Sequence, residues 1–368
     1  MANSAGRSRN TFFSLGTQAQ LRAHETDPFT SFRAARLPRR RYLVTGCAGF
    51  IGSQLTQVLA ASGCSVVGVD CFTDNYPRAV KEGNIHRSSV GGDVEFQERD
   101  LAEAAPEPLL EGVSGVFPLA ARPGVRTSWG ATFEHYLRDN ILVTQRVFEA
   151  AVKQGVKVVY ASSSSVYGEA EAYPLREDAK PIPVSPYGVS KLSCEALATS
   201  YGRSLGLDAV GMRYFSVYGP RQRPDMAFSR VFDCIANDRP FRVHGNGRQS
   251  RDFTYVGDVD DATIAAMAMG TPGGVYNLGG GSEISLLDSL TLCEQVAGRT
   301  LQVAHVAAAT GDARRTVADY GKAATELGWS PRTTLEEGLR AQAGEALGLD
   351  PIDEPARPAQ PLELLGSA

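Results

Sequence analysis

Residues 45–53 have the sequence TGCAGFIGS and follow a short apolar run at 42–44. Gly46, Gly49 and Gly52 recur there at every third position, before a segment with helical spacing. In a turn from strand to helix, the first glycine permits the sharp bend, the second lets the backbone approach a pyrophosphate, and the third lets the helix pack closely. The free N–H groups at the helix start favour an anion. This stretch therefore predicts a dinucleotide-binding turn.

An acidic residue ends the next apolar run, SVVGVD at 65–70. Asp70 follows Gly52 by 18 residues, close to the spacing at which a carboxylate accepts hydrogen bonds from the adenosine ribose hydroxyls. A carboxylate at this place repels the 2′-phosphate of NADP, so we expect NAD. Asp100 ends a third run, and its carboxylate is a candidate partner for the adenine amino group.

Short apolar runs alternate with helical segments up to about residue 217, which is typical of a parallel sheet covered on both faces. We therefore predict an α/β fold, with a doubly wound parallel sheet of Rossmann type at 41–217. Further strands are expected around 94–96, 115–117, 156–160 and 208–212.

A loop-rich second half is expected to form a smaller mixed α/β substrate-binding domain at 218–345, with part of 250–285 packing back on the first domain. We expect an irregular, arginine-rich extension at 1–40 and a Pro-rich tail at 346–368.

The composition favours a small-molecule ligand. The 368 residues are 43% hydrophobic and 21% charged with a net charge of −4, which indicates a globular protein without a basic surface for nucleic acid or membrane lipid. No apolar run reaches the roughly 18 residues of a transmembrane helix, and the run after Arg41 is too short for a signal peptide. The six cysteines stand singly, so we expect reduced thiols, no metal site and a cytoplasmic protein.

A serine, a tyrosine and a lysine form the candidate catalytic set. Ser163 lies in ASSSSVYG at 161–168, directly after an expected strand, and Tyr187 and Lys191 lie four residues apart in YGVSK. This spacing places the phenol and the ammonium on one helical face. A phenol ordinarily ionises near pH 10, and a neighbouring ammonium together with the nicotinamide charge favours the phenolate. Tyr187 is thus a candidate general base, and Ser163 a hydrogen-bond partner for the same substrate hydroxyl.

Together these motifs resemble those of the extended short-chain dehydrogenases/reductases, in the branch of nucleotide-sugar epimerases, decarboxylases and dehydratases. The resemblance covers residues 42 to about 340 and rests on TGCAGFIGS, ASSSSVYG, SPYGVSK, RYFSVYGPRQRPDM and RQSRDFTYVGDV, in this order. Within the branch, GVRTSW at 124–129 and GPRQRPDM at 219–226 are most similar to UDP-glucuronate 4-epimerases. The resemblance implies a homodimer that acts on a UDP-sugar.

The implied reaction is an epimerisation at C4. Tyr187 would remove the proton of the sugar 4-hydroxyl while the C4 hydride passes to NAD, and the resulting 4-keto sugar would rotate and take the hydride back on its other face. NAD is then kept and recycled. By resemblance, the cofactor positions are Gly46, Gly49, Phe50, Ile51, Gly52, Asp70, Asn75, Asp100, Leu101, Leu119, Ala121, Asn140, Tyr187, Lys191, Tyr214 and Phe215.

The expected substrate-binding residues are hydroxyl donors, arginines and two apolar side chains. They are Arg126, Ser163, Ser164, Ser165, Ser216, Arg223, Met226, Val243, Arg251 and Arg314. The serines and Arg223 are expected near the sugar carboxylate, and Arg251 and Arg314 at the diphosphate. Two alternatives stay open: Arg223 could stabilise its own loop through an ion pair, and Arg126 could hold its own loop instead of facing the substrate.

Two positions depart from the family pattern. Pro118 stands where histidine is common, and Arg122 stands where glutamine is usual, which adds a charge near the expected substrate entrance. A UDP-glucuronate decarboxylase and a neutral UDP-sugar 4-epimerase remain alternatives, because both share the oxidation step. A 4,6-dehydratase is disfavoured, since Ser164-Ser165 stands in place of its carboxylate pair. A non-catalytic nucleotide-sugar sensor is disfavoured by the intact catalytic set.

Overall fold

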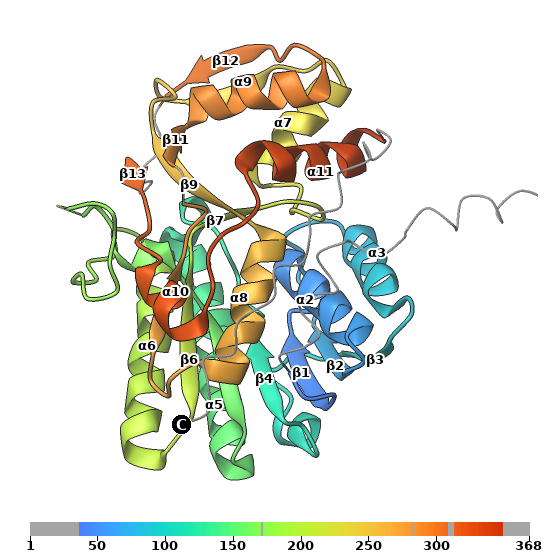
Figure 1. Cartoon of the computed structure of the whole chain (residues 1–368), viewed down its shortest axis with the longest axis vertical. Helices are drawn as coiled ribbons and strands as arrows, with labels where there is room; N and C mark the ends of the chain where they lie inside the picture. Colours follow the sequence, from blue (N-terminus) through green and yellow to red (C-terminus); the bar gives the residue numbers. More distant parts are fainter. Residues whose placement is uncertain (1–36, 171, 282, 308–312, 349–368) are drawn as a thin grey trace, which may run out of the picture.

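The computed structural model describes residues 37–170, 172–281, 283–307 and 313–348. Figure 1 shows a large sheet with helices on its faces and a smaller part above it. Most of the extension expected at 1–40 and of the tail expected at 346–368 lies outside the described residues.

The large sheet contains seven parallel strands in the order β3-β2-β1-β4-β5-β6-β10. Their bounds are β1 Arg41–Thr45, β2 Ser65–Asp70, β3 Asp93–Glu98, β4 Gly115–Pro118, β5 Lys157–Ser163, β6 Ala209–Tyr214 and β10 Val275–Leu278. The central strands are buried, as their continuous apolar runs predict. The predicted doubly wound sheet is confirmed, and among the described residues β10 is its one strand from beyond residue 217.

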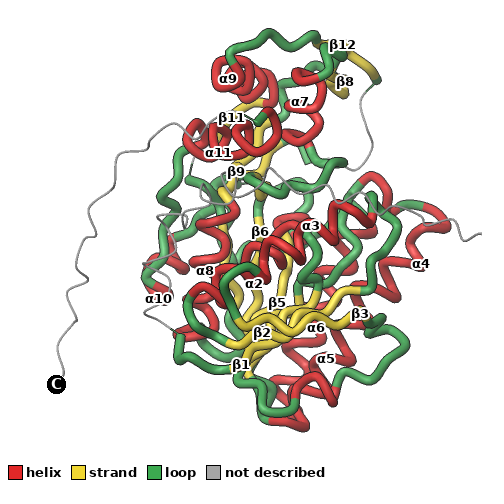
Figure 2. The backbone as a smooth tube through the Cα atoms, turned by 90° about the vertical axis from the view of Figure 1, so that its right-hand side faces the viewer, coloured by secondary structure: helices red, strands yellow, loops and turns green. Residues whose placement is uncertain are grey.

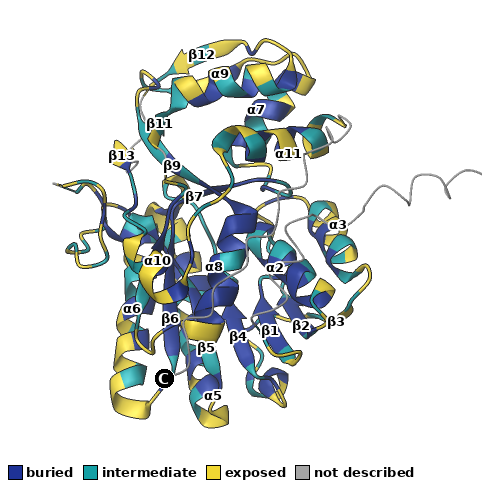
Figure 3. Cartoon of the chain, in the orientation of Figure 1, coloured by how far each residue is buried: buried dark blue, intermediate teal, exposed yellow. Residues whose placement is uncertain are grey.

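Helices cover both faces of this sheet (Figure 2). On one face α2 (Phe50–Ala61) and α8 (Val256–Met269) pack against each other, flanked by α3 (Arg78–Ser89) and α10 (Gly321–Leu327). On the other face lie α5 (Val143–Gln154) and α6 (Pro186–Leu205). Apolar side chains between the helices and the sheet form two cores. Figure 3 shows in dark blue that the buried residues follow the strands of the large sheet and parts of the helices that cover it.

The upper part holds three helices and two small sheets. The helices are α7 (Ala227–Ala236), α9 (Leu286–Ala297) and α11 (Leu335–Leu347). One sheet pairs β8 (Phe241–His244) with β12 (Val303–Val306), and the other joins β7 (Ser216–Tyr218), β9 (Ser250–Tyr255), β11 (Glu283–Ser285) and β13 (Arg315–Thr316). These short helices and strands, with glycine and proline between them, form the smaller mixed α/β part expected for the second half.

The two parts exchange chain segments. β7 spans the expected boundary at 217/218 and pairs with β9 in the upper part, whereas α8, β10 and α10 return to the large sheet. β10 is an edge strand that pairs in parallel with β6. Two parallel neighbours need a long connection between them, so the chain leaves the large sheet after β6 and returns to it at β10. The chain therefore crosses between the parts more than once.

Candidate active site

A cavity of about 760 Å³ opens where the carboxyl ends of the parallel strands face the upper part. Its wall combines the glycine loop, the ends of β2, β5 and β6, the loop at 123–127, and residues from α7, β8 and β9. Ligands of doubly wound sheets bind at this edge, because the loops that follow the strands converge there. The cavity brings together most of the residues that the sequence singled out.

Gly46 and Gly52 in the glycine loop have no room for a side chain. Gly46 has φ +72°, and a Cβ placed on it would lie 2.7 Å from the backbone nitrogen of Ala120. A Cβ on Gly52 would lie 2.1 Å from the carbonyl oxygen of Gly46. Gly49 precedes α2, and Gly49, Phe50, Ile51 and Gly52 line the cavity, so the helix begins at the cavity wall with no side-chain cap on its first N–H groups. This cradle fits a pyrophosphate.

Asp70 and Asn75 lie on the cavity wall near the end of β2. Asp70 accepts hydrogen bonds from the amides of Ala48 (3.2 Å) and Phe72 (2.8 Å), and burial raises the pKa of its carboxyl. Lys81, which sequence reasoning missed, is 3% exposed and donates to Asn75 Oδ1 at 3.0 Å. Its burial lowers the pKa of the ammonium. The lysine anchors the segment that carries Asn75.

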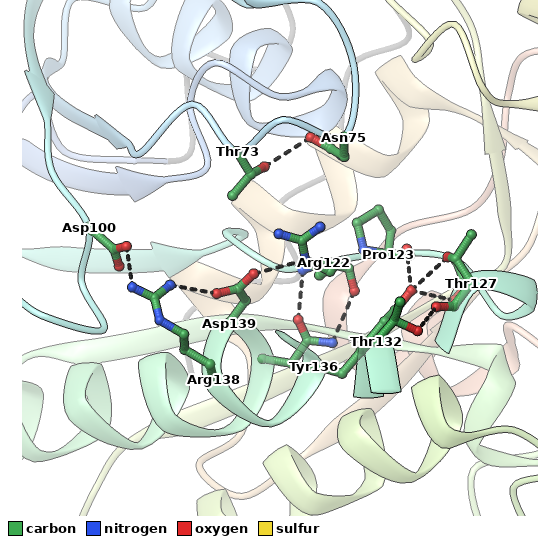
Figure 4. Close-up of polar contacts among 12 residues, drawn as sticks. Thr73, Asn75, Asp100, Arg122, Pro123, Thr127, Thr132, Tyr136, Arg138 and Asp139 are labelled. Carbon is green, nitrogen blue, oxygen red and sulfur yellow. Dashed lines mark hydrogen bonds and ion pairs between the residues drawn. The ribbon is translucent and has the colours of Figure 1, made fainter. Parts of the chain in front are cut away.

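A chain of alternating charges lies below this segment in Figure 4, and its two carboxylates, Asp100 and Asp139, line the cavity. Arg138 pairs with Asp100 and, at 2.9 Å, with Asp139. Asp139 also pairs with Arg122 through Nε at 3.0 Å. The extra charge of Arg122 is therefore matched by Asp139 and is not an isolated cation at the entrance.

The catalytic candidates come from the end of β5 and the start of α6. Ser163 ends β5, where its hydroxyl oxygen accepts a hydrogen bond from the Ser165 amide at 3.1 Å. Ser185 caps α6 through the Gly188 amide, which places Tyr187 in the first turn and Lys191 one turn later. Lys191 Nζ donates to the carbonyl of Ala161 on β5 at 2.9 Å.

Three separate parts of the chain thus contribute to one wall. Ser163, Tyr187 and Lys191 all line the cavity together with the glycine loop. This arrangement can remove a proton from a hydroxyl next to a bound dinucleotide.

The substrate side of the cavity carries arginines and hydroxyls. Arg223 lines the cavity and pairs through two nitrogens with Asp225, at 2.9 and 2.8 Å. The loop-stabilising ion pair considered for Arg223 is therefore present, on the cavity wall itself. The other lining residues predicted for the substrate are Arg126, Ser163, Ser164, Ser165, Ser216, Met226 and Arg251.

Comparison with known proteins adds a family to this geometry. Residues 42–279 match the family described as "NAD dependent epimerase/dehydratase family". The chain belongs to this family. The family assignment predicted from the motifs is confirmed.

Relatives of this chain within the family have names that specify a substrate. A UDP-glucuronate 4-epimerase of Thermodesulfobacterium geofontis (strain OPF15) is 36% identical over 307 residues, covering 81% of this chain and 94% of the relative. A Bacillus subtilis (strain 168) protein named as an uncharacterized UDP-glucose epimerase is 40% identical over 304 residues, covering 81% and 95%. The crystal structure of UDP-glucuronic acid 4-epimerase from Bacillus cereus, in complex with UDP-glucuronic acid and NAD, matches with a TM-score of 0.81 and 41% identity, covering 84% of this chain and 99% of that chain.

Three residues predicted for the site of this epimerase/dehydratase family member do not line the cavity. Asn140 is 1% exposed and lies behind the wall, where it bonds the backbone of Arg122 and the hydroxyl of Ser190. Val243 is fully buried in the core because it points inward from β8. Arg314 is exposed, and its amide bonds Glu169. Their positions depend on tertiary packing that motif spacing does not encode.

The upper part contributes lining residues that sequence reasoning missed. They include Arg230, Arg242, His244 and Gln249. The signal for α7 was available, since Phe228, Val231, Phe232 and Ile235 are all buried and recur with helical spacing. Which polar residues of the upper part face the cavity depends on how its helices and strands pack together.

Within the described ranges, the structure has no helix that is both long enough and apolar enough to cross a membrane. The same residues include no group of three or more His, Cys, Asp or Glu side chains placed to hold a metal ion.

Proposed function

We propose that this protein is a UDP-glucuronate 4-epimerase, which interconverts UDP-glucuronate and UDP-galacturonate while keeping NAD bound. One observation carries the proposal: a single cavity joins the glycine loop, the set Ser163, Tyr187 and Lys191, and a wall of hydroxyl and guanidinium donors. The 41% identical Bacillus cereus enzyme, whose crystals contain UDP-glucuronic acid and NAD, supports this substrate.

The residues of the cavity fit NAD. Bound NAD supplies a reversible hydride acceptor for C4 of the sugar. The cradle of Gly46, Gly49 and Gly52 leaves space for the pyrophosphate, and the N-terminus of α2 directs N–H groups toward it. The Asp70 carboxylate suits the ribose hydroxyls and opposes a 2′-phosphate.

Tyr187 acts as the general base and then as the general acid. Its phenolate takes the proton of the 4-hydroxyl, and the phenol returns this proton after the hydride has come back to the opposite face of the 4-keto sugar. Lys191, whose ammonium donates to the Ala161 carbonyl, lies one helical turn after Tyr187 on the same face of α6. Ser163 orients the hydroxyl that reacts.

Retention of the carboxylate separates an epimerase from a decarboxylase. The 4-keto form of glucuronate is a β-keto acid, which loses carbon dioxide when the C5–C6 bond aligns with the carbonyl π system. Ser164, Ser165, Ser216 and Arg223 line the cavity and can hold the carboxylate out of this alignment through charge-assisted hydrogen bonds.

The proposal is tested by incubating the purified protein with UDP-glucuronate and following the products by NMR. We expect UDP-galacturonate without net NADH, and we expect Tyr187→Phe to slow turnover by roughly 100-fold or more, as for loss of a general base, while NAD stays bound. UDP-pentose with carbon dioxide would show a decarboxylase instead. Full activity of Tyr187→Phe would remove the proposed base.

A neutral UDP-sugar 4-epimerase is the second candidate, because the 40% identical Bacillus subtilis relative is named as a UDP-glucose epimerase. UDP-glucose in a parallel incubation separates the two substrates. Faster conversion of UDP-glucose than of UDP-glucuronate would favour the neutral sugar.

We also propose a cytoplasmic homodimer that forms through the helical face of α5 and α6. All six cysteines are free, which suits a reducing compartment. Large apolar side chains are exposed on and near these helices: Leu137 (45%), Leu142 (42%), Val189 (44%) and Leu205 (58%). The mass in solution, measured by light scattering, tests the dimer, and a monomer at micromolar concentration would contradict it.

A further inference from the structure

Tyr136 lies behind the wall of the active-site cavity and is 1% exposed. It ends the short helix α4 (Phe133–Tyr136) and is not among the lining residues. Its side chain nevertheless contacts two structures that do line the cavity, the loop at 123–127 and the ring of Tyr187. It therefore connects the substrate side of the site with the catalytic phenol.

The hydroxyl oxygen of Tyr136 lies within hydrogen-bond distance of three groups of the loop at 123–127 (Figure 4). This oxygen lies 3.0 Å from the Pro123 carbonyl, 2.9 Å from the Gly124 carbonyl and 2.8 Å from Thr127 Oγ1. A phenol has a single proton, so it donates to one carbonyl at a time and can accept from the threonine hydroxyl. The bonded loop is tightly bent, since Gly124 has φ +107°.

The ring of Tyr136 makes a different contact. It meets the ring of Tyr187 edge to face, with centroids 6.2 Å apart and planes at 72°. This is a favoured aromatic geometry. Tyr187 stands in the first turn of α6, and its side chain reaches into the cavity, so a packed neighbour limits the directions in which its phenol can point.

We propose that Tyr136 is a positioning residue with two separable contacts. Its hydroxyl holds the loop at 123–127, which lines the substrate side of the cavity, and its ring holds the phenol of Tyr187. The proposal rests on the 4-epimerase function proposed above. Loop contacts act on the substrate in the ground state and in the transition state alike, so losing them raises KM. The direction of the Tyr187 phenol matters at proton transfer, so losing the ring contact lowers kcat.

Two substitutions separate the contacts. Tyr136→Phe keeps the ring against Tyr187 and removes the hydroxyl, whereas Tyr136→Leu removes both. The matched control is Tyr276→Phe, because Tyr276 is also fully buried and its hydroxyl donates to Glu326 at 2.6 Å, but it lies outside the cavity wall. All three variants are purified with their NAD and compared by thermal melting before the kinetics are measured.

We expect Tyr136→Phe to raise KM for the UDP-sugar by roughly three- to tenfold, because this factor corresponds to the net free energy of about one hydrogen bond. The same variant should keep kcat within about twofold of wild type. Tyr136→Leu should in addition lower kcat by roughly tenfold or more. Tyr276→Phe should change neither constant. A KM in Tyr136→Phe equal to that of Tyr276→Phe, or equal kcat values in the two Tyr136 variants, would overturn the corresponding half of the proposal.

A binding experiment keeps this proposal distinct from the proposed function. The dissociation constant of UDP-glucuronate is measured by calorimetry in Tyr187→Phe and in the same protein with Tyr136→Phe added. Failure of Tyr187→Phe to bind UDP-glucuronate contradicts the proposed substrate. Binding that is equally tight in both proteins contradicts the role of the Tyr136 hydroxyl. A weaker affinity in the double variant, by the same factor as the rise in KM, supports it.

Discussion

Asp70 is the residue at which the chain meets the adenosine ribose in the proposed complex. Burial raises the pKa of its carboxyl, although the Ala48 and Phe72 amides donate to it. Ribose hydroxyls donate to the ionised form, so NAD binds best above the raised pKa, and its affinity falls as the pH decreases through that pKa. We expect wild-type protein to lose NAD at a pH where an ordinary aspartate is still ionised, measured as NAD retained after desalting across a pH series.

The control for this prediction is Asp70→Asn, which cannot ionise. It should hold NAD more weakly at neutral pH and show no acid-dependent loss in this range. If wild type and Asp70→Asn lose NAD over the same pH interval, another group controls retention.

At the scale of the element, the start of α2 distinguishes two glycines. A Cβ on Gly52 would lie 2.1 Å from the Gly46 carbonyl oxygen, whereas the nearest atom to a Cβ on Gly49 is 3.0 Å away. We expect Gly52→Ala to destabilise the fold by roughly 1–3 kcal/mol, as for overpacking. Gly49→Ala should lose NAD, because the methyl group occupies the approach to the pyrophosphate, and should melt near wild-type protein from which NAD has been removed.

Thermal melting and bound NAD, measured on the same preparations, check the pair. A Gly52→Ala protein that melts like wild type and keeps NAD would mean that the turn has more freedom than its geometry indicates.

At the scale of the whole molecule, one buried ion pair joins the catalytic helix to the sheet. Arg213 on β6 bonds both carboxylate oxygens of Glu195 on α6, at 2.9 and 2.7 Å, with side chains only 6% and 9% exposed. Ser162 and Tyr167 bond the same pair. Removing one partner leaves a buried charge, so we expect Arg213→Met to cost about 3–5 kcal/mol in unfolding free energy.

The comparison variant for this prediction is Arg340→Ala. Arg340 pairs with Glu336 on the exposed face of α11, where both side chains are about half exposed, and such helix pairs are worth about 0.3–0.5 kcal/mol. Urea denaturation measures both variants. Equal losses of stability would show that the Glu195 carboxylate is less isolated from water than its burial indicates.

Much of the fold and of the cavity wall was predictable because the signals are local. The apolar runs of β1 and β2, the glycine loop between them, and the four-residue spacing of Tyr187 and Lys191 are each encoded within a few residues. Strand burial, backbone freedom at glycine and the helical repeat act over such distances, so one sequence suffices to recognise them.

Other features arise only when distant segments meet. β10 joins the large sheet beside β6, Asp139 matches the charge of Arg122, and Tyr136 reaches from α4 to Tyr187. The same packing places Asn140 behind the cavity wall and Val243 in the core. The amino-acid sequence alone determined the strand, glycine turn and helix at 41–61 and the four-residue spacing of Tyr187 and Lys191. Tertiary packing decided which side chains face the cavity, because side-chain direction and ion pairing depend on partners remote along the chain.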